Sequence, residues 1–436
     1  MGLVPRHLGA AVGAASLVVG AGLGAVAVGA APEAGASPSA VLYVSHTATP
    51  SNSGHSCATA AYTSVQAAVT AAPAGATVYL CGTTPFVGSV VIQTKPLGLT
   101  GDPGAAIAAG DGSAATGIPA TTFFSSKGLV TPHSVVTVLG AQDVSVAGIN
   151  VEGPFFSGCA GDEYGVLQLG SGLLRLTGDQ VTEIRGLHTA TWGCQSGVAV
   201  QIGREYWPQP AGTFAVEDFT GNADIVHTTV TTYQKNGITA DGPGTRVAIV
   251  GSTVSGNGPT IHTAQNGIQI SRGATGQVHN DTISGNECQV VIPTGVATGI
   301  LVFGGAGTPL STDVQVHNDT LVNNDVGIDV AEYNATGTAG ATSSTDNQVH
   351  NNTVTKSDGD TNRADFSGYT SYQAGIADSG NGDQVHNNTI TGTVVTGADA
   401  AYGPETKSGG PFLVPMTVAT GTGLMVHSNT FDGAAL

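Results

Sequence analysis

A six-residue phrase recurs along the C-terminal half of this chain and limits the possible folds more than any other feature. It reads Val-His-Asn-Asn-Thr-Val at 349–354 and Val-His-Asn-Asn-Thr-Ile at 385–390, with close variants at 278–283, 316–321 and 426–431. Weaker copies stand at 144–149, 176–181, 225–230 and 249–254. A second phrase, Gly followed by an aliphatic residue, alternates with the first; its aliphatic residues are Val166, Val198, Ile238, Ile268, Ile300, Ile328 and Ile376. An interleaved repeat of about 30 residues indicates a solenoid.

The repeat unit is built from short strands. No window has the i, i+3, i+4 apolar spacing of a helix, whereas the first and sixth positions of the phrase are apolar with small polar residues between them. In a coil of parallel strands these ends would point inward, with successive turns ~4.8 Å apart. We expect the fourth position to lie at a tight bend and to form an internal polar ladder. It is occupied by Asp179, Thr228, Ser252, Asp281, Asp319, Asn352, Asn388 and Asn429.

These phrases resemble the asparagine-ladder consensus of the right-handed parallel β-helix proteins, the pectin-lyase-like superfamily. The resemblance runs from about residue 140 to the C-terminus. It extends to 62–69, which reads as a short amphipathic helix, and to a turn and first strand at 73–80. In the family such a helix caps the open end of the coil. The resemblance implies an all-β, three-sided coil of about 9–11 turns with a short N-terminal capping helix. It implies no single activity, because the fold hosts lyases, hydrolases, epimerases, adhesins and inert surface proteins.

Residues 1–36 are expected to form a secretion signal peptide. Arg6 and His7 precede an apolar run from Leu8 to Ala30, followed by small residues suited to cleavage. The run is also long enough to serve as a retained anchor. We expect 40–100 to hold the cap helix and first turns, and 101–436 the repeats, as one domain. The protein is therefore expected to be secreted, extracellular or at the cell surface.

The five cysteines fit an oxidising compartment. Cys57 and Cys81 flank the predicted cap helix, and a disulfide between them would tie it to the first strand. Cys159 and Cys194 each lie a few residues before the Gly-Val of successive turns, so the coil would bring them together. Cys288 is left over, either as a buried apolar residue or as a reactive thiol.

The charge balance restricts the partners. Charged residues make up 10% of the chain and the net charge is −18. This argues against nucleic acid and against anionic membranes once the signal is removed. It argues mildly against polyanionic substrates unless Ca²⁺ bridges like charges, as in a lyase. We expect a monomer whose partner is a polysaccharide or a cell-surface glycan.

The known catalytic signatures of this fold are absent from the sequence. The hydrolase branch carries Asn-Thr-Asp, Asp-Asp, Gly-His-Gly and Arg-Ile-Lys elements and a pectate-lyase branch carries Trp-Ile-Asp-His, but none occurs here. Outward residues counted from the Gly-aliphatic phrase give a candidate groove with four possible catalytic residues: Asp241, Arg272, Asp329 and Glu332. Asp241 and Arg272 fall on neighbouring turns, as an acid or base with an electrostatic stabiliser. Carboxylates on separate turns could flank a glycosidic bond. The alternative is a solvated face with an incidental ion pair.

Two further features are candidates for binding. The insertion at 203–222 concentrates aromatic and acidic residues suited to sugar faces: Glu205, Tyr206, Trp207, Glu217 and Asp218. The same residues could simply pack the loop onto the coil. The second position of five successive phrases is His, and these rings should form an outward column; they are His279, His317, His350, His386 and His427. Such a column could share Zn²⁺ or Cu²⁺, or the rings could simply stack.

Three functions remain open. The first is an exported β-helix protein that binds or processes a polysaccharide by lyase or glycoside hydrolase chemistry. The second is a non-catalytic surface protein whose stiff rod presents loops for adhesion. The third is metal binding through the His column. Carboxylates brought together by adjacent turns would favour an enzyme, whereas scattered ones would favour a scaffold.

Overall fold

The computed structural model describes most of the repeat region and the segment before it. The described residues are 40–110, 124–125, 128–129, 132–155, 162–189, 192–204, 220–288, 297–305, 307–334, 340–341, 343–357, 374–392, 414–418, 423 and 425–435. They fall within one compact unit, Ser39–Leu436. The predicted signal peptide lies outside them. Among the helices in these ranges, none is long and apolar enough to cross a membrane.

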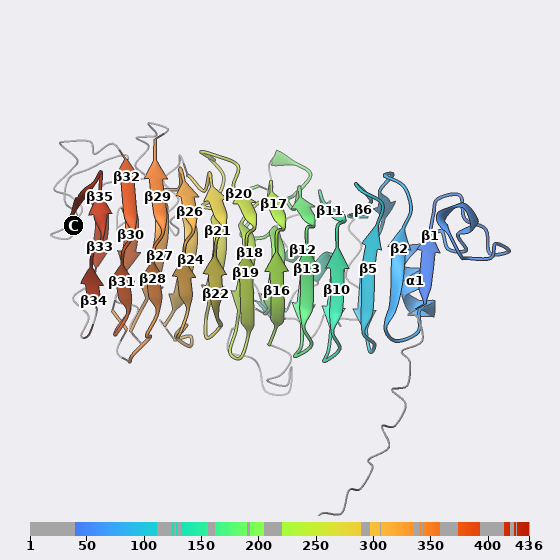
Figure 1. The fold of residues 1–436 in the computed structure, drawn as a ribbon, viewed down its shortest axis with the longest axis horizontal. Coiled ribbons are helices and arrows are strands. Elements are labelled where there is room, and N and C mark those ends of the chain that lie inside the picture. The colour runs from blue at the N-terminus through green and yellow to red at the C-terminus, as the bar shows by residue number, and fades with distance from the viewer. Residues whose placement is uncertain are drawn as a thin grey trace, which may run out of the picture. The chain divides into compact units, whose positions relative to one another are not determined.

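Three sheets run side by side along the coil (Figure 1). In spatial order, sheet A contains β1 (Val41–Val44), β2 (Ala76–Leu80), β5 (Leu97–Gly101), β10 (Val144–Ala147), β13 (Leu174–Thr177), β16 (Asn222–Val226), β19 (Arg246–Val250), β22 (Thr275–His279), β25 (Gln315–His317), β28 (Gln348–His350), β31 (Gln384–His386) and β34 (Met425–His427). Sheet B contains β3 (Phe86–Val87), β6 (Ala106–Ala108), β11 (Asn150–Glu152), β14 (Gln180–Thr182), β17 (Thr229–Thr231), β20 (Thr253–Ser255), β23 (Thr282–Ser284), β26 (Thr320–Val322), β29 (Thr353–Lys356), β32 (Thr389–Gly392), β35 (Thr430–Phe431) and β36 (Ala434–Ala435). Sheet C contains β4 (Val90–Gln93), β9 (Pro132–Leu139), β12 (Asp162–Leu169), β15 (Val198–Gly203), β18 (Asn236–Asp241), β21 (Asn266–Ser271), β24 (Thr298–Gly304), β27 (Val326–Glu332), β30 (Ala374–Asp378) and β33 (Val414–Val418).

Consecutive strands of the repeats enter different sheets, and each strand pairs in parallel with its equivalent one turn away. Within the described ranges, the antiparallel pairs are β35 with β36 at the C-terminal end and the hairpin of β7 (Phe124–Ser125) and β8 (Gly128–Leu129). The fold is therefore a three-sided parallel β-helix, as the family resemblance implies. Sheet A has 12 strands in the described part of the chain. This slightly exceeds the expected turns, because no repeat phrase marks β1, β2 or β5 and β1 lies ahead of the expected first strand.

The N-terminal cap is present, with one more strand than predicted. Helix α1 (Val65–Ala71) follows the 3-10 turn η1 (Cys57–Thr59) and begins at Ser64, whose Oγ accepts a hydrogen bond from the backbone N–H of Ala67. The Cys57–Cys81 disulfide joins the cap to sheet A, as predicted, with the two Cα atoms 5.5 Å apart. Strand β1 pairs in parallel with β2, ahead of the expected first strand.

Aliphatic side chains in register fill the interior of the coil. On sheet C the pairing continues from Val166 through Val200 and Ile238 to Ile268, and then through Ile300, Ile328 and Ile376. Val198 is therefore not equivalent to Ile238, as the Gly-Val phrase suggested, because it pairs with Asn236 two positions earlier. The predicted start of the weakest copy of the first phrase, 144–149, is likewise two residues too early. Leu176, the first residue of the next copy, pairs with Val146 and not with Val144.

The predicted polar ladder follows the bend between sheets A and B. From Ser252 to Asn429, a side-chain oxygen of each rung accepts a hydrogen bond from the backbone N–H of the rung one turn earlier. The bonds join Asp281 N to Asp319 Oδ1 at 2.8 Å, Asp319 N to Asn352 Oδ1 at 3.0 Å, and Asn352 N to Asn388 Oδ1 at 3.0 Å. The unusual backbone angles belong to the third position, not the fourth as expected: Asn280, Asn318, Asn351 and Asn387 have φ of 57° to 60°. This left-handed residue turns the chain so that the next side chain enters the coil.

The Asp rungs lack the hydrogen bonds that the Asn rungs donate from Nδ2. Asn352 and Asn388 each donate from Nδ2 to a backbone carbonyl of the previous turn, at 3.0 Å. The matching Oδ2 atoms of Asp281 and Asp319 are buried without a hydrogen-bond partner. Burial raises the pKa of Asp281 to about 7 and that of Asp319 to about 8. Protonation supplies the missing donor, so these two carboxyls favour the neutral form in the folded chain.

We predict that the coil loses stability as the pH rises from about 4 to about 8, because the folded state holds protons that the unfolded carboxyls release near pH 4. Asp281→Asn with Asp319→Asn should raise the melting temperature at pH ~8 and leave it nearly unchanged at pH ~4. Melting curves across this range test the prediction. The matched control is Asn352→Asp, which should introduce the same alkaline loss. Equal pH profiles for all three proteins would contradict the role of the Asp rungs.

A buried cation joins three turns at the corner between sheets B and C. Lys356 Nζ lies 2.5 Å from Glu287 Oε1 and 3.9 Å from Asp325 Oδ1, and the Lys356 side chain is fully buried. Asp325 also accepts a hydrogen bond from the backbone N–H of Cys288. Two carboxylates and one ammonium group thus take the place of an apolar contact, an arrangement that is costly to leave incomplete.

Replacing Lys356 by Met should lower the free energy of unfolding by about 3–5 kcal/mol, since Glu287 would be left buried without its cation. Adding Glu287→Gln should recover part of that loss. Denaturant unfolding measures both effects. Arg175→Met is the control, because its pair with Asp224 is 3.7 Å long and half exposed, and it should change stability little.

Candidate functional site

A strip of polar side chains follows the outer face of sheet C across β18 and β21. Asn236 Nδ2 donates to Thr239 Oγ1 and to Gln269 Oε1, both at 2.9 Å. Asn266 Nδ2 donates to Asn236 Oδ1 and to Gln269 Oε1, both at 3.2 Å. Gln269 Nε2 then donates to Ser271 Oγ at 2.8 Å. These side chains are buried although they lie on the outer face, so a continuous amide and hydroxyl network is shielded from water.

The strip ends at an ion pair between neighbouring turns. Arg272 donates from Nε to Asp241 Oδ1 at 3.0 Å and from Nη2 to Asp241 Oδ2 at 2.9 Å. Ser271 Oγ also donates to Asp241 Oδ1. The Arg272 guanidinium lies 5.9 Å from the centre of the Phe303 ring. The structure thus joins the two residues that the sequence placed within reach. Since both carboxylate oxygens of Asp241 already accept hydrogen bonds, the pair is suited to holding polar groups in place.

One acceptor in the strip has no partner. Asn266 Oδ1 is buried without a hydrogen bond, while the Nδ2 of the same amide donates twice. A buried acceptor that lacks a donor costs free energy, and a bound hydroxyl group or water would remove that cost. The strip therefore contains one unsatisfied acceptor beside the ion pair, shielded from solvent like its neighbours.

The other two predicted catalytic residues do not join this pair. Asp329 lies on β27, three strands from β18, which corresponds to ~14 Å. That exceeds the roughly 5–9.5 Å that separates the carboxyl groups of glycosidases. Glu332 is fully buried, contrary to its predicted outward position, because it is an even number of residues from the core residue Ile328. The carboxylates expected to flank one bond are thus separated.

Glu332 belongs to a buried acidic corner. Its Oε1 accepts a hydrogen bond from the backbone N–H of Ser311, and its Oε2 has no partner. Burial, together with the charges of Asp383 and Asp378, raises the pKa of Glu332 to about 9. The group is therefore neutral near pH 7 and lies away from the outer face.

The predicted aromatic and acidic binding residues Glu205, Tyr206, Trp207, Glu217 and Asp218 lie outside the described residues. What the structure shows is where that segment begins. Strand β15 ends at Gly203, which pairs with Asp241.

Of the two cysteines in the second predicted disulfide, Cys194 is described and is disulfide-bonded, whereas Cys159 lies outside the described residues. Cys288 is buried and not disulfide-bonded.

The five predicted histidines form a column on sheet A. Neighbouring ring centres are 4.9–5.0 Å apart and the rings are within 9° of parallel. In parallel rings the nitrogen lone pairs point in the same direction and do not converge on one ion at the usual ~2.0–2.1 Å from each nitrogen. Among the described residues, no group of three or more His, Cys, Asp or Glu side chains is arranged to hold a metal ion. The geometry therefore favours stacking over a shared metal.

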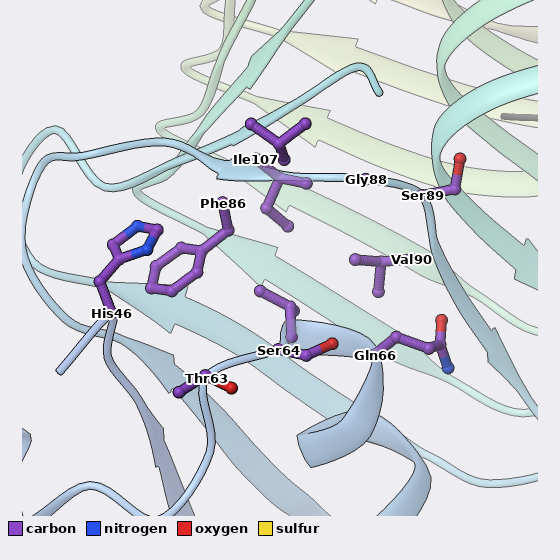
Figure 2. Close-up of a pocket in the computed structure, with 11 residues that line it drawn as sticks. His46, Thr63, Ser64, Gln66, Phe86, Gly88, Ser89, Val90 and Ile107 are labelled. Carbon is purple, nitrogen blue, oxygen red and sulfur yellow. The ribbon is translucent and has the colours of Figure 1, made fainter. Parts of the chain in front are cut away.

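A separate pocket of about 340 Å³ lies beside α1 at the N-terminal end (Figure 2). On one side the rings of His46 and Phe86 stack with their centres 4.3 Å apart. On the other, Gln66 accepts a hydrogen bond from the backbone N–H of Val91. None of the predicted catalytic residues lines this pocket, and its lining has no carboxylate. It contributes to the cap and not to the sheet C strip.

The sequence analysis missed the amide part of the strip. Asn236, Asn266 and Gln269 attracted no attention because isolated amides occur throughout the repeats. A usable signal was present, since Asn precedes Gly-Ile in two neighbouring turns, at 236–238 and 266–268. Its meaning depends on register, because the two Asn side chains meet only when β18 pairs with β21.

Comparison with known proteins supports the fold. No family model and no curated protein matches the sequence. The structure of GH136 lacto-N-biosidase from Eubacterium ramulus is similar to 90% of this chain and 67% of its own, with a TM-score of 0.52 and 10% identity. The complex of XylC with xylose is similar over 81% of this chain and 69% of its own, with a TM-score of 0.45 and 11% identity. At such identity, the first similarity concerns the parallel β-helix fold alone.

We predict that Asp241→Asn and Arg272→Met each lower the free energy of unfolding by roughly 3–5 kcal/mol, because each leaves a largely buried partner without its counterpart. The double variant should lose clearly less than the sum of the two losses. Urea unfolding of the four proteins measures the coupling. Strict additivity would show that the pair does not hold the two turns together.

Proposed function

We propose that this protein is an exported parallel β-helix protein that binds a polysaccharide along the outer face of sheet C. The observation that carries the proposal is the fixed amide strip beside the Asp241–Arg272 pair, in which Asn266 Oδ1 lacks the donor that a sugar hydroxyl would supply. Amides and charged pairs fixed by their neighbours are suited to sugar hydroxyls, which both donate and accept hydrogen bonds. The aromatic and acidic residues at 205–218 follow β15 in the sequence, and their composition suits sugar faces; β15 itself ends at Gly203, which pairs with Asp241.

Export is supported by the apolar N-terminal run and by the disulfide at Cys57–Cys81, which is typical of oxidising compartments. The carbohydrate class is supported by the fold neighbour, a lacto-N-biosidase. Binding is favoured over hydrolysis by paired carboxylates, because the register separates Asp241 from Asp329. The separation equally favours the second candidate, a non-catalytic surface protein that binds glycans with its rigid face.

Binding to a panel of plant, algal and bacterial polysaccharides, with and without Ca²⁺, tests the proposal. Asn266→Thr copies the residue at the paired position of the next turn, Thr298, so we expect it to fold and to bind about tenfold more weakly. Thr282→Ser, exposed on sheet B, is the matched control and should bind normally.

Reducing ends and the ultraviolet absorbance of unsaturated sugars are followed in the same experiment. Both signals together would show that the protein also cleaves the polysaccharide as a lyase, whereas reducing ends alone would show that it hydrolyses the polysaccharide. Wild-type protein that binds nothing across the panel, or Asn266→Thr protein that binds as well as the wild type, would remove the sheet C strip as the site.

A further inference from the structure

The outer face of sheet A carries two columns of identical side chains over its C-terminal turns. Strands β22, β25, β28 and β31 each end in Gln-Val-His, and β34 ends in Met-Val-His. The Gln residues 277, 315, 348 and 384 pair with one another in register, as do the five His residues. The two columns are two residues apart along each strand, or ~6.6 Å, and successive turns are ~4.8 Å apart.

Three of the five rings are held by the Asn that follows them, whereas Nδ1 of His386 is buried without a hydrogen-bond partner. Nδ1 of His279, His317 and His350 accepts a hydrogen bond from the Nδ2 of the Asn that follows it, at 2.8–3.0 Å. A neutral ring whose Nδ1 accepts must carry its proton on Nε2, which therefore faces outward as a donor. On protonation the Asn amide can turn its oxygen to Nδ1, so the same neighbour supports the charged ring. His279, His317 and His350 are thus three N–H donors at one-turn spacing.

The strand geometry does not require these residues. One turn before the array, Val250 occupies the His position and Ala248 the Gln position. In the two turns before that, the Gln position holds Asp224 and Arg175. Within the array the core residue at position six varies between Ile, Leu, Val and Phe, and the intervals between phrases vary, yet His is unchanged in all five turns. Duplication of the repeat alone does not explain why the His on the outer face varies less than the core residue at position six.

Among the described residues, the bend and sheet B residues that flank the column are uncharged. The bend residues Asn280, Asn318, Asn351, Asn387 and Ser428 and the facing sheet B residues Thr282, Thr320, Thr353, Thr389 and Thr430 carry no charge. The exposed carboxylates Asp313 and Asp346 precede the Gln column by two residues. Asp281 and Asp319 lie inside the coil, with the pKa of each carboxyl raised by burial. The nearest cation on the adjacent strand β19 is Arg246, at its start. Protonated rings would therefore form a cationic stripe on a protein of net charge −18.

We propose that the outer face of sheet A from β22 to β34 binds a linear acidic polysaccharide, with its carboxylates against the His column and its hydroxyls against the Gln column. An extended glycan lying along the coil presents its acidic groups at intervals comparable to the turn spacing. Several carboxylates and several rings can then pair at once, which multiplies a weak single contact. This inference rests on the proposed function for the class of ligand, but it uses a different face.

Binding should strengthen at mildly acidic pH. Burial and the neighbouring rings lower the pKa of His317 and His350 in the free protein, and likewise that of His386, where the neighbour is His427. A bound carboxylate favours the charged ring, so binding and proton uptake are linked. The polymer should therefore bind more tightly as the pH falls toward the range where His takes up a proton.

Polygalacturonate is the probe, with dextran as the neutral control, measured by calorimetry at low ionic strength and about pH 5.5 and 7.5. We expect about tenfold tighter binding of polygalacturonate at the lower pH and no pH effect on dextran. His317→Gln, His350→Gln and His386→Gln combined should abolish the pH effect. His350→Lys keeps a charge at both pH values and should retain binding at pH ~7.5; it also tests the inference if the triple variant fails to fold.

The inference would be overturned if binding by the wild type did not depend on pH, or if the His variants kept the full pH dependence. The two proposals fail separately. Asn266→Thr should leave the pH-dependent component intact, whereas the His variants should leave the sheet C binding intact. Loss of both components in either variant would show that the two faces do not act independently and would contradict this assignment.

Discussion

The structure depends on one hydrogen bond repeated from turn to turn at the bend between sheets A and B. A side-chain oxygen inside the coil accepts the backbone N–H of the rung before it, as between Asn388 and Asn352. The bend would otherwise bury an unsatisfied backbone donor in every turn. The left-handed residue just before each rung, such as Asn351, directs the next side chain inward. Together these two positions set the register of all three sheets.

Because side chains inside the coil satisfy the backbone hydrogen-bond donors of the bend, the residues on the outer faces can differ from sheet to sheet. Sheet C has a buried strip of amides that ends in the Asp241–Arg272 pair. Sheet A has parallel imidazoles that face solvent. The same scaffold thus holds one water-shielded polar face and one exposed, titratable face. Each is positioned by strand pairing and does not depend on a loop to hold it in place.

The chain also tolerates charge inside the coil where the ladder residues permit it. Asp281 and Asp319 replace Asn at two rungs and favour the protonated form, because a carboxylate cannot donate as an amide does. Lys356 is accepted at a buried corner because Glu287 faces it from two turns away. Both substitutions fit the geometry of the repeat while making stability depend on pH or on a specific partner.

The repeat phrases were sufficient to predict the solenoid, the rungs of the ladder and the His column, because each depends on spacing along the chain. The three-sided coil was implied by the family resemblance, and the cap disulfide was predicted from the positions of Cys57 and Cys81 on either side of the cap helix. The sequence alone did not determine which side chains meet across turns. Val198 was misplaced because its Gly-Val phrase lies two positions before the residue that pairs with Ile238, and Glu332 because it is an even number of residues from Ile328 and so faces the core. The amide network of Asn236, Asn266 and Gln269, and the distance between Asp241 and Asp329, were decided by the tertiary structure, since strand register brings together residues about 30 positions apart and separates others.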